Sequence, residues 1–236
     1  MFFIDYSNCF SYKPGVNMTY SDGCVCVYNS KNEIGHSNPY FRFILSPNKT
    51  IFYNEPHSKM ILSDIYYLYD IKTIKKFNLK ITDYQVLDLF KFGHIEVLEW
   101  LKKSNMLFLS LRRKNIYMDI ASEYGHVDIL EWMKNSGLPL KYSDKAFINA
   151  SKNGHVNVLE WWKNSGLHLK YSSGSNFCNS ALGLASKEGH VDVLNWWKNS
   201  GLLLQYDIDV LDWISTYGHI NVLDWWFNSG LPLISL

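Results

Sequence analysis

Cysteine is scarce in this sequence, and no two cysteines form the paired motif of a zinc site. The four are Cys9, Cys24, Cys26 and Cys178, and none belongs to a Cys-x-x-Cys unit. A structural zinc ribbon needs such paired units, so we expect no metal site and no cofactor. The charged fraction is 19% and there is no Pro/Gly-rich tract, which excludes wholesale disorder.

The chain also lacks an excess of charge of either sign. Lys and Arg total 23 against 22 for Asp and Glu, a net charge of +1, unlike a basic nucleic-acid binder or an acidic tail. No stretch approaches the ~18 apolar residues of a membrane span. The N-terminus, MFFID, has no basic segment and is a poor signal peptide. We therefore expect a soluble, intracellular protein with reduced thiols that contacts neither nucleic acid nor membrane.

A block that opens with Gly-His occurs five times. The copies begin at residues 93, 125, 154, 189 and 218, with spacings of 32, 29, 35 and 29. The best copies read GHVDILEWMKNSGLPL (125–140), GHVNVLEWWKNSGLHL (154–169), GHVDVLNWWKNSGLLL (189–204) and GHINVLDWWFNSGLPL (218–233). Matching over most of the block is not chance, so the chain is built from internal repeats.

Each block predicts a helix that ends at its second glycine. With the first Gly as position 0, apolar residues fall at positions 2, 4, 5, 7 and 8, the spacing of an amphipathic helix. Lys at position 9 suits a helix C-terminus, and Gly at position 12 suits the left-handed residue that ends it. The first copy has Asn105 there. The expected structural glycines are Gly125, Gly137, Gly154, Gly166, Gly189, Gly201, Gly218 and Gly230.

A shorter helix is predicted ahead of each Gly-His. Small residues recur at one place in it, as Ala121, Ala150 and Ala185, each followed by Ser. Small side chains let neighbouring helices approach closely. The repeating unit is therefore a short helix, a Gly turn, a longer helix, a Gly stop and a loop of about a dozen residues.

The block resembles the ankyrin repeat, whose second half typically reads G-H-x-x-V-V-x-L-L-L-x-x-G-A. The two glycines stand twelve apart in both, and the period near 33 agrees. The chain departs from the family in three ways. The T-P-L-H-x-A signature survives only as residues such as Leu182 and Ala185, and Trp replaces Leu in the longer helix. Two of the spacings are 29, which shortens the hairpin-like finger between those repeats. LEWWKNSGL resembles ankyrin proteins of amoeba-infecting giant DNA viruses of the mimivirus kind. The resemblance implies an all-α, ankyrin-type helix-turn-helix solenoid of about five to six repeats.

The repeat domain is expected to cover residues 61–236. A degenerate capping repeat at about 61–83 has Asp70 where His would stand, and Leu62–Phe77 predicts two short helices. Residues 1–60 hold four of the six prolines and an alternating aromatic stretch at 40–44, which predicts short strands and loops. The repeats themselves are expected at about 84–112, 113–142, 143–171, 172–206 and 207–236.

The recurring histidines and tryptophans are assigned structural roles. Successive helices stand roughly 8–10 Å apart, whereas Zn–N bonds measure about 2 Å. One His per repeat therefore cannot converge on a metal, and each is expected to begin a helix and hydrogen-bond loop backbone. The tryptophans are expected in the core; the alternative is stacking on bases or sugars, and one of each tandem pair can reach a groove edge. These residues are His126, His155, His190, His219, Trp132, Trp161, Trp196 and Trp225.

No catalytic motif stands out: the sequence has no G-x-S-x-G, no H-E-x-x-H and no phosphate-binding glycine loop. Cys178 and His168 lie ten apart, a coincidental pair. The candidate binding residues lie at the loop tips, where Tyr beside Lys suits protein recognition. The alternative is that these Tyr only cover loop backbone. The tips carry Lys141, Tyr142, Lys170, Tyr171, Gln205 and Tyr206.

Together these features predict a non-enzymatic scaffold that binds a host or viral protein, in the host cytoplasm if the chain is viral. One alternative is a substrate-recruiting adaptor for host ubiquitin ligase machinery, which in this family uses an F-box-like helical segment. Another is an enzyme with its site in residues 1–60. Phe227 replaces the Lys of other copies in the last block, and end repeats usually carry a polar outer face. We therefore expect frayed C-terminal residues or self-association through that end.

Overall fold

The computed structural model divides the chain into two compact units. Unit 1 comprises residues 1–89 and 96–105, and unit 2 comprises residues 90–95 and 106–236. The sequence placed the boundary after residue 60; the structure groups most of the first helix pair with the N-terminal segment instead. The structure describes residues 3–4, 24–27, 40–45, 61–62, 66–76, 79, 81–105, 107, 116–171, 180–204, 206 and 210–232.

Unit 1 contains a five-stranded sheet centred on β2 and β3. β2 pairs parallel with β1 and antiparallel with β3, and both β4 and β5 pair antiparallel with β3. The strand predicted for the aromatic stretch at 40–44 is confirmed by β3; most of the remaining residues of 1–60 lie outside the described part. The strands are β1 (Phe3–Ile4), β2 (Cys24–Val27), β3 (Tyr40–Leu45), β4 (Ile61–Leu62) and β5 (Tyr66–Tyr67).

Of the two helices predicted for Leu62–Phe77, the first is wrong and the second is confirmed. Tyr66 pairs with Phe41 of β3, because aromatic residues suit a pleated surface and cross-strand pairing prevails over the weak helical pattern. The helix α1 (Ile71–Lys76) follows. Asp70 begins it: its carboxylate accepts hydrogen bonds from the Thr73 amide and hydroxyl, both at 2.9 Å. A carboxylate there satisfies amides that have no partner within the helix.

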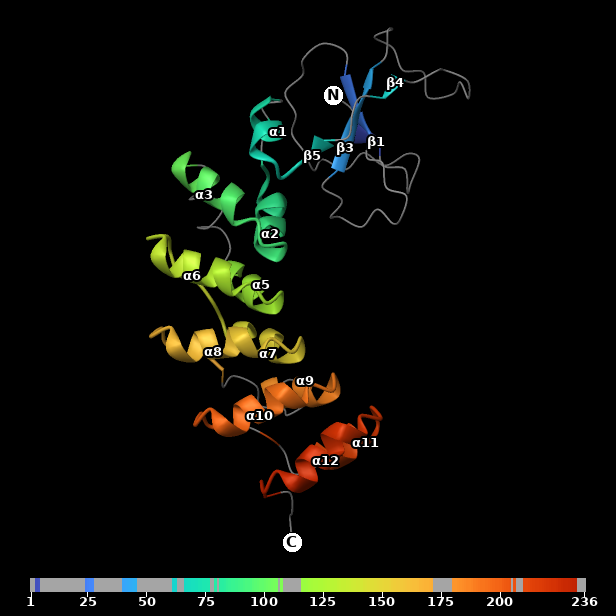
Figure 1. Cartoon of the computed structure of the whole chain (residues 1–236), viewed down its shortest axis with the longest axis vertical. Helices are drawn as coiled ribbons and strands as arrows, with labels where there is room; N and C mark the ends of the chain where they lie inside the picture. Colours follow the sequence, from blue (N-terminus) through green and yellow to red (C-terminus); the bar gives the residue numbers. More distant parts are fainter. Residues whose placement is uncertain are drawn as a thin grey trace. The chain divides into compact units, whose positions relative to one another are not determined.

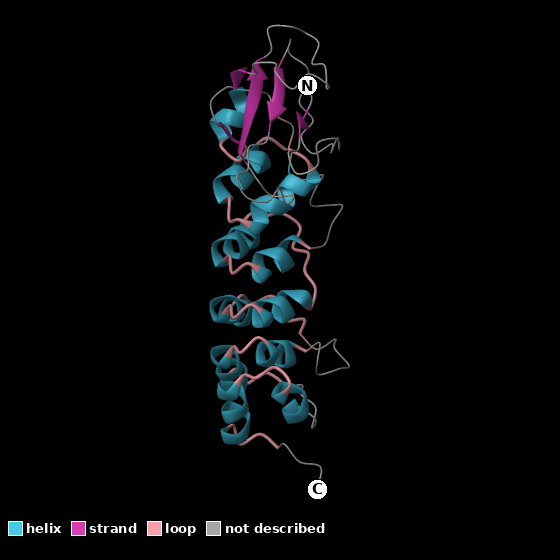
Figure 2. Cartoon of the chain, turned by 90° about the vertical axis from the view of Figure 1, so that its right-hand side faces the viewer, coloured by secondary structure: helices cyan, strands magenta, loops and turns pink. Residues whose placement is uncertain are grey.

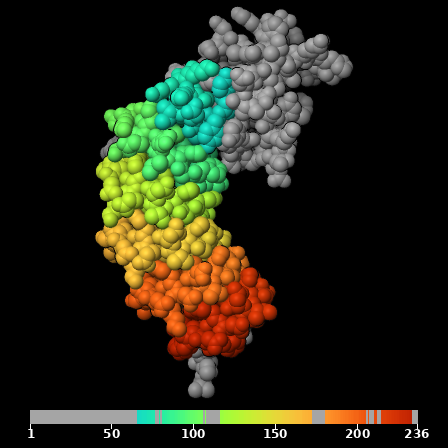
Figure 3. All heavy atoms as spheres, in the orientation of Figure 1, coloured from blue at the N-terminus to red at the C-terminus, as the bar shows by residue number. Residues whose placement is uncertain are grey.

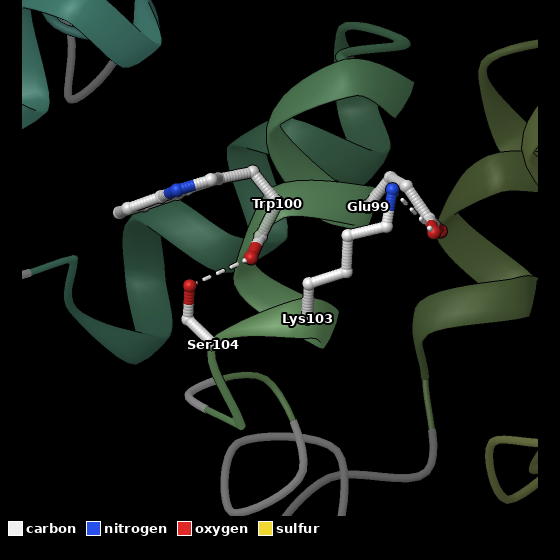
Figure 4. A network of polar contacts seen from close by, with 4 residues as sticks. All are labelled: Glu99, Trp100, Lys103 and Ser104. Carbon is white, nitrogen blue, oxygen red and sulfur yellow. Dashed lines mark hydrogen bonds and ion pairs between the residues drawn. The ribbon is translucent and has the colours of Figure 1, made fainter.

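The first full copy of the block forms α2 (Asp83–Lys91) and α3 (Ile95–Lys103). At the end of α3, the Ser104 hydroxyl donates to the carbonyl of Trp100 at 2.9 Å, and Lys103 pairs with Glu99 at 3.6 Å (Figure 4). Asn105 adopts φ +57°, the left-handed conformation that glycine takes in the other copies. Asn tolerates this region better than most residues, so the missing glycine does not prevent the helix stop.

Unit 2 contains four successive helix pairs within its described residues (Figures 1 and 2). Each Gly-His lies between the two helices of a pair, as predicted. The shorter helices contact one another in chain order, and so do the longer ones. The pairs are α5 (Tyr117–Glu123) with α6 (Val127–Asn135), α7 (Lys145–Lys152) with α8 (Val156–Asn164), α9 (Ala181–Lys187) with α10 (Val191–Asn199), and α11 (Val210–Ser215) with α12 (Ile220–Asn228).

The buried face of each longer helix is narrower than predicted. Positions 4, 5 and 8 are fully buried in α8, as Val158, Leu159 and Trp162, while Trp161 at position 7 is half-buried. Position 8 lies between positions 4 and 5 around the helix, whereas position 7 points about 100° away from it. The prediction that the position-7 tryptophans form the core is therefore wrong for Trp132, Trp161, Trp196 and Trp225, which are half-buried. The core residues are Met133, Trp162, Trp197 and Trp226.

Each core tryptophan hydrogen-bonds to the preceding helix pair. The indole Nε1 of Trp162 donates to Ser122 Oγ at 2.9 Å. Trp197 donates to Ser151 at 2.9 Å and Trp226 to Ser186 at 3.0 Å. A buried indole N–H without an acceptor is destabilising, so Ser follows the small Ala of each shorter helix for a specific reason.

The glycines at positions 0 and 12 all have φ between +71° and +82°. The position-0 glycines also face the histidine of the next block: a Cβ on Gly154 would lie 2.9 Å from the His190 ring. Gly218 has the same backbone conformation, φ +73°, but nothing would lie within 4 Å of its Cβ. Gly154 is thus required for both conformation and space, and Gly218 for conformation alone.

We predict that Gly154→Ala destabilises the protein more than Gly218→Ala. A left-handed alanine costs ~1–2 kcal/mol at either position. At Gly154 the added methyl also meets the imidazole, which costs a further ~1–3 kcal/mol. Urea unfolding followed by circular dichroism measures both. Equal losses would show that the His190 ring moves aside at no cost.

A second comparison separates the two tryptophans of α8. Trp162→Ala should lower the free energy of unfolding by ~3–5 kcal/mol, because it empties a fully buried site. Trp161→Ala should cost ~1–2 kcal/mol, since this side chain is half-exposed. The same urea experiment applies, and the reverse order would mean that the assignment of core and edge is mistaken.

Candidate functional site

The candidate binding residues lie on three segments that follow the position-12 glycines. We call residues 138–144, 167–171 and 202–206 fingers A, B and C. Each joins a longer helix to the next pair, and fingers B and C precede stretches outside the described residues. Lys141 and Tyr142 are on finger A, Lys170 and Tyr171 on finger B, and Tyr206 on finger C. Gln205 lies outside the described residues.

The three finger tyrosines pack against the core tryptophans of the following pairs. The ring centroid of Tyr142 lies 4.7 Å from that of Trp162. The distances are 5.6 Å from Tyr171 to Trp197 and 5.4 Å from Tyr206 to Trp226. All three rings are half-buried. Each ring therefore covers the edge of the core and exposes only its remaining part.

Fingers A and B are joined by polar contacts around Tyr142. Its hydroxyl donates to the carbonyl of His168 at 2.9 Å. The Lys170 ammonium donates to the Tyr142 carbonyl at 3.1 Å and lies 4.6 Å from the ring centroid, within reach of a cation–π interaction. Partial burial raises the pKa of Tyr142, so its hydroxyl remains a donor at neutral pH. The two fingers thus hold each other in place.

Finger A is also attached to the helix pair before it. Asp119 of α5 is only 3% exposed and accepts hydrogen bonds from the Ser143 amide at 2.8 Å and the Ser143 hydroxyl at 2.6 Å. Burial raises the pKa of Asp119, although these two bonds act in the opposite direction. The sequence offered no indication of this contact, because the equivalent positions of the next two shorter helices hold Ile148 and Gly183.

Two of the recurring histidines contact backbone carbonyls, although at a helix end and not in a loop as predicted. His126 Nε2 lies 2.8 Å from the Lys91 carbonyl, and His155 Nε2 lies 3.0 Å from the Glu123 carbonyl. In each contact the nitrogen carries the proton, since a carbonyl only accepts. Both carbonyls belong to the end of the preceding shorter helix. Burial lowers the pKa of His94 and of His155, which favours the neutral imidazole. Among the described residues, no three His, Cys, Asp or Glu side chains gather as metal ligands would.

A row of polar contacts accompanies the half-buried tryptophans. The indole nitrogens of Trp161 and Trp196 donate at 2.7 Å to Glu131 and Glu160, one longer helix earlier. Trp225 donates to Asn195 at 2.7 Å in the same way. The hydrogen bond from Trp161, followed by that from Asn135, lowers the pKa of Glu131. These indole N–H groups are therefore already bonded within the protein.

Two further expectations from the sequence concern Cys178 and membrane-spanning helices. Cys178 is not described, so its relation to His168 stays a sequence observation. None of the described helices is long and apolar enough to span a membrane. All of the predicted binding residues except Gln205 lie on fingers A, B and C within the described part of the chain.

The histidine contacts predict a pH dependence of stability. Because burial lowers the pKa of His94 and His155 below the ordinary value of 6.5, their contribution to stability is complete above that pH and is lost as the pH falls through the lowered values. The unfolding midpoint in urea should therefore drop as the pH is reduced below about 6.5. In His155→Gln, which keeps a side-chain N–H but does not titrate, the drop should be smaller.

Asp119 acts in the opposite direction, because a raised pKa gives stability that is lost as the pH rises. An Asp119→Asn background removes this opposing contribution and isolates the histidine effect. An identical pH dependence of the wild type and His155→Gln in that background would contradict the prediction.

No protein-family model matches the sequence, and no curated protein matches it.

Proposed function

We propose that the repeats form an ankyrin-like solenoid and that the protein is a non-enzymatic scaffold that binds another protein. Three features support the fold: a left-handed glycine at positions 0 and 12, the Gly-His between paired helices, and contacts between successive pairs. Two helices per repeat at a period near 33 residues are typical of the ankyrin family. Repeat proteins of this class use their extended surface to bind partners.

The observation that carries the proposed function is the repeated finger tyrosine. Each ring is immobilised on one side by a core tryptophan and exposed on the other. Tyrosine is enriched at protein interfaces because it offers a large apolar area together with a hydroxyl. A ring that is already ordered loses little conformational entropy on binding. The same chemistry therefore recurs once per helix pair along one edge.

The start of α7 extends this surface beside finger A. Lys145, its first residue, is exposed and directly follows the finger. It adds a lysine to those of fingers A and B. A partner of mixed polar and apolar character, with carboxylates opposite the lysines, suits this surface. We propose that this partner is a host or viral protein.

The binding face is tested with finger variants that preserve packing. Replacing Tyr171 and Tyr206 together with Phe keeps each ring on its tryptophan and removes two hydroxyls. Tyr142 is left unchanged, because its hydroxyl donates to the His168 carbonyl within the protein. Each lost hydrogen bond to a partner should weaken binding by ~0.5–1.5 kcal/mol. Affinity capture from cell lysate, with quantitative mass spectrometry, should show reduced recovery of a specific protein by the double variant.

The matched control changes exposed polar residues at the opposite end of the longer helices. Asn157→Ala with Asp192→Asn should leave both the recovery and the melting temperature unchanged, since these side chains lie in the first helical turn, away from the fingers. If the wild type recovers no specific protein, the proposed function is wrong. If only the control variant loses recovery, the function stands and the assigned face is wrong.

A further inference from the structure

Lysine occupies the same position of the repeat on two successive fingers. Counted from the glycine that opens each block, Lys141 of finger A and Lys170 of finger B both stand at position 16. The helix pairs of unit 2 follow one another in chain order, as the bands from yellow-green to red in Figure 3 show. The two lysines are therefore one repeat apart along the row of fingers. Finger C has the uncharged Gln205 at this position of the sequence.

Fingers A and B carry a surplus of positive charge. Asp144 is the only Asp or Glu in the two fingers, and it is half-buried. Asp119 of α5 is close to finger A, but it is buried and its carboxylate already accepts two hydrogen bonds from Ser143. The exposed Lys145 adds a third ammonium directly after finger A. In the part of the chain that the structure describes, neither Lys145 nor Lys170 forms an ion pair.

The Lys170 side chain is exposed and yet held in place. Its ammonium donates to the carbonyl of Tyr142 at 3.1 Å and lies 4.6 Å from the centroid of the Tyr142 ring. An ammonium has three N–H donors, so two remain after this hydrogen bond. Because both contacts already order the side chain, binding an anion costs it less conformational entropy than an unrestrained lysine would lose. Lys170 is thus prepared to bind a carboxylate.

We propose that fingers A and B bind an extended, acidic segment of the partner protein, with one of its carboxylates hydrogen-bonded to the Lys170 ammonium. This inference rests on the proposed function and specifies the chemistry of the partner. Successive helix pairs stand roughly 8–10 Å apart, and an extended chain covers that distance in about three residues. Carboxylates about three residues apart in the segment therefore meet Lys170 and Lys141 in turn.

Single-stranded nucleic acid, which is also negatively charged, suits this surface less well. Proteins that bind such strands stack the bases on open aromatic faces. The face of the Tyr142 ring that the Lys170 ammonium covers is not open to a base. The positive charge also ends at finger B, because the described lining of the small pocket between fingers B and C is uncharged and includes Leu182 and Leu203. Carboxylates at intervals match this surface better than a phosphate at every nucleotide.

Fluorescence anisotropy of the full chain with two labelled peptides tests the proposal. One peptide repeats Glu-Pro-Ala, which favours an extended conformation and places a carboxylate at every third residue. The matched peptide repeats Gln-Pro-Ala. The wild type should bind the Glu peptide and not the Gln peptide, and added salt should weaken the binding because it screens exposed charges. Lys170→Gln should weaken binding of the Glu peptide about two- to fivefold, whereas Lys170→Arg, which keeps the charge, should retain it.

Lys152→Gln is the matched control, because Lys152 is exposed but ends α7, whereas finger A precedes the start of that helix. It should leave binding of the Glu peptide unchanged, and the melting temperature should stay constant in all three variants. The proposal is overturned if the wild type does not bind the Glu peptide at millimolar concentration, if both peptides bind equally, or if Lys152→Gln weakens binding as much as Lys170→Gln.

Tighter binding of a single-stranded oligothymidylate than of the Glu peptide would also overturn the proposal and indicate a nucleic-acid partner. The proposed function fails separately. If the lysate experiment recovers a specific protein through Tyr171 and Tyr206 while the Glu peptide does not bind, the scaffold function stands and only the acidic segment is wrong.

Discussion

The packing of unit 2 depends on the left-handed glycine that precedes each histidine. Its positive φ ends the shorter helix and reverses the chain into the longer one. Its missing side chain leaves the space that the histidine of the next block fills, as His190 does beside Gly154. His155, which fills the corresponding space beside Gly125, is held in turn by the Glu123 carbonyl. One residue without a Cβ therefore fixes both the turn within a pair and the distance to the next pair.

The tryptophan–serine hydrogen bond adds a specific polar contact between neighbouring helix pairs. Each bond joins a longer helix to the shorter helix of the pair before it, as from Trp197 to Ser151. The α6 pair is informative because it has Met133 in place of Trp, and the preceding segment has Phe90 in place of Ser. Where the indole donor is missing, the acceptor is missing too. Neighbouring pairs are thus coupled by a specific bond as well as by apolar contact, which favours cooperative unfolding.

The sequence predicted those features that depend on local conformation. The longer helices, both sets of glycines and the backbone contacts of His126 and His155 follow from spacing and from the conformations open to each residue. The sequence could not show which of Trp161 and Trp162 is more deeply buried. Apolar residues stand at five positions of the repeat and cover a wider face of the helix than the neighbouring helices bury. The strand at Tyr66–Tyr67 was missed because pairing with β3 is non-local. Asp119–Ser143 was missed because that contact does not repeat.

The difference between the finger tyrosines and Phe227 lies in how each ring is held before any partner binds. Tyr142 has Trp162 against its face and His168 at its hydroxyl, so its orientation is set in the free protein. Phe227 is 66% exposed and keeps more rotational freedom. Ordering the Phe227 side chain on binding costs conformational entropy. The finger tyrosines avoid most of this cost, because they are already ordered in the free protein. The finger tyrosines are therefore better suited than Phe227 to specific recognition of a partner.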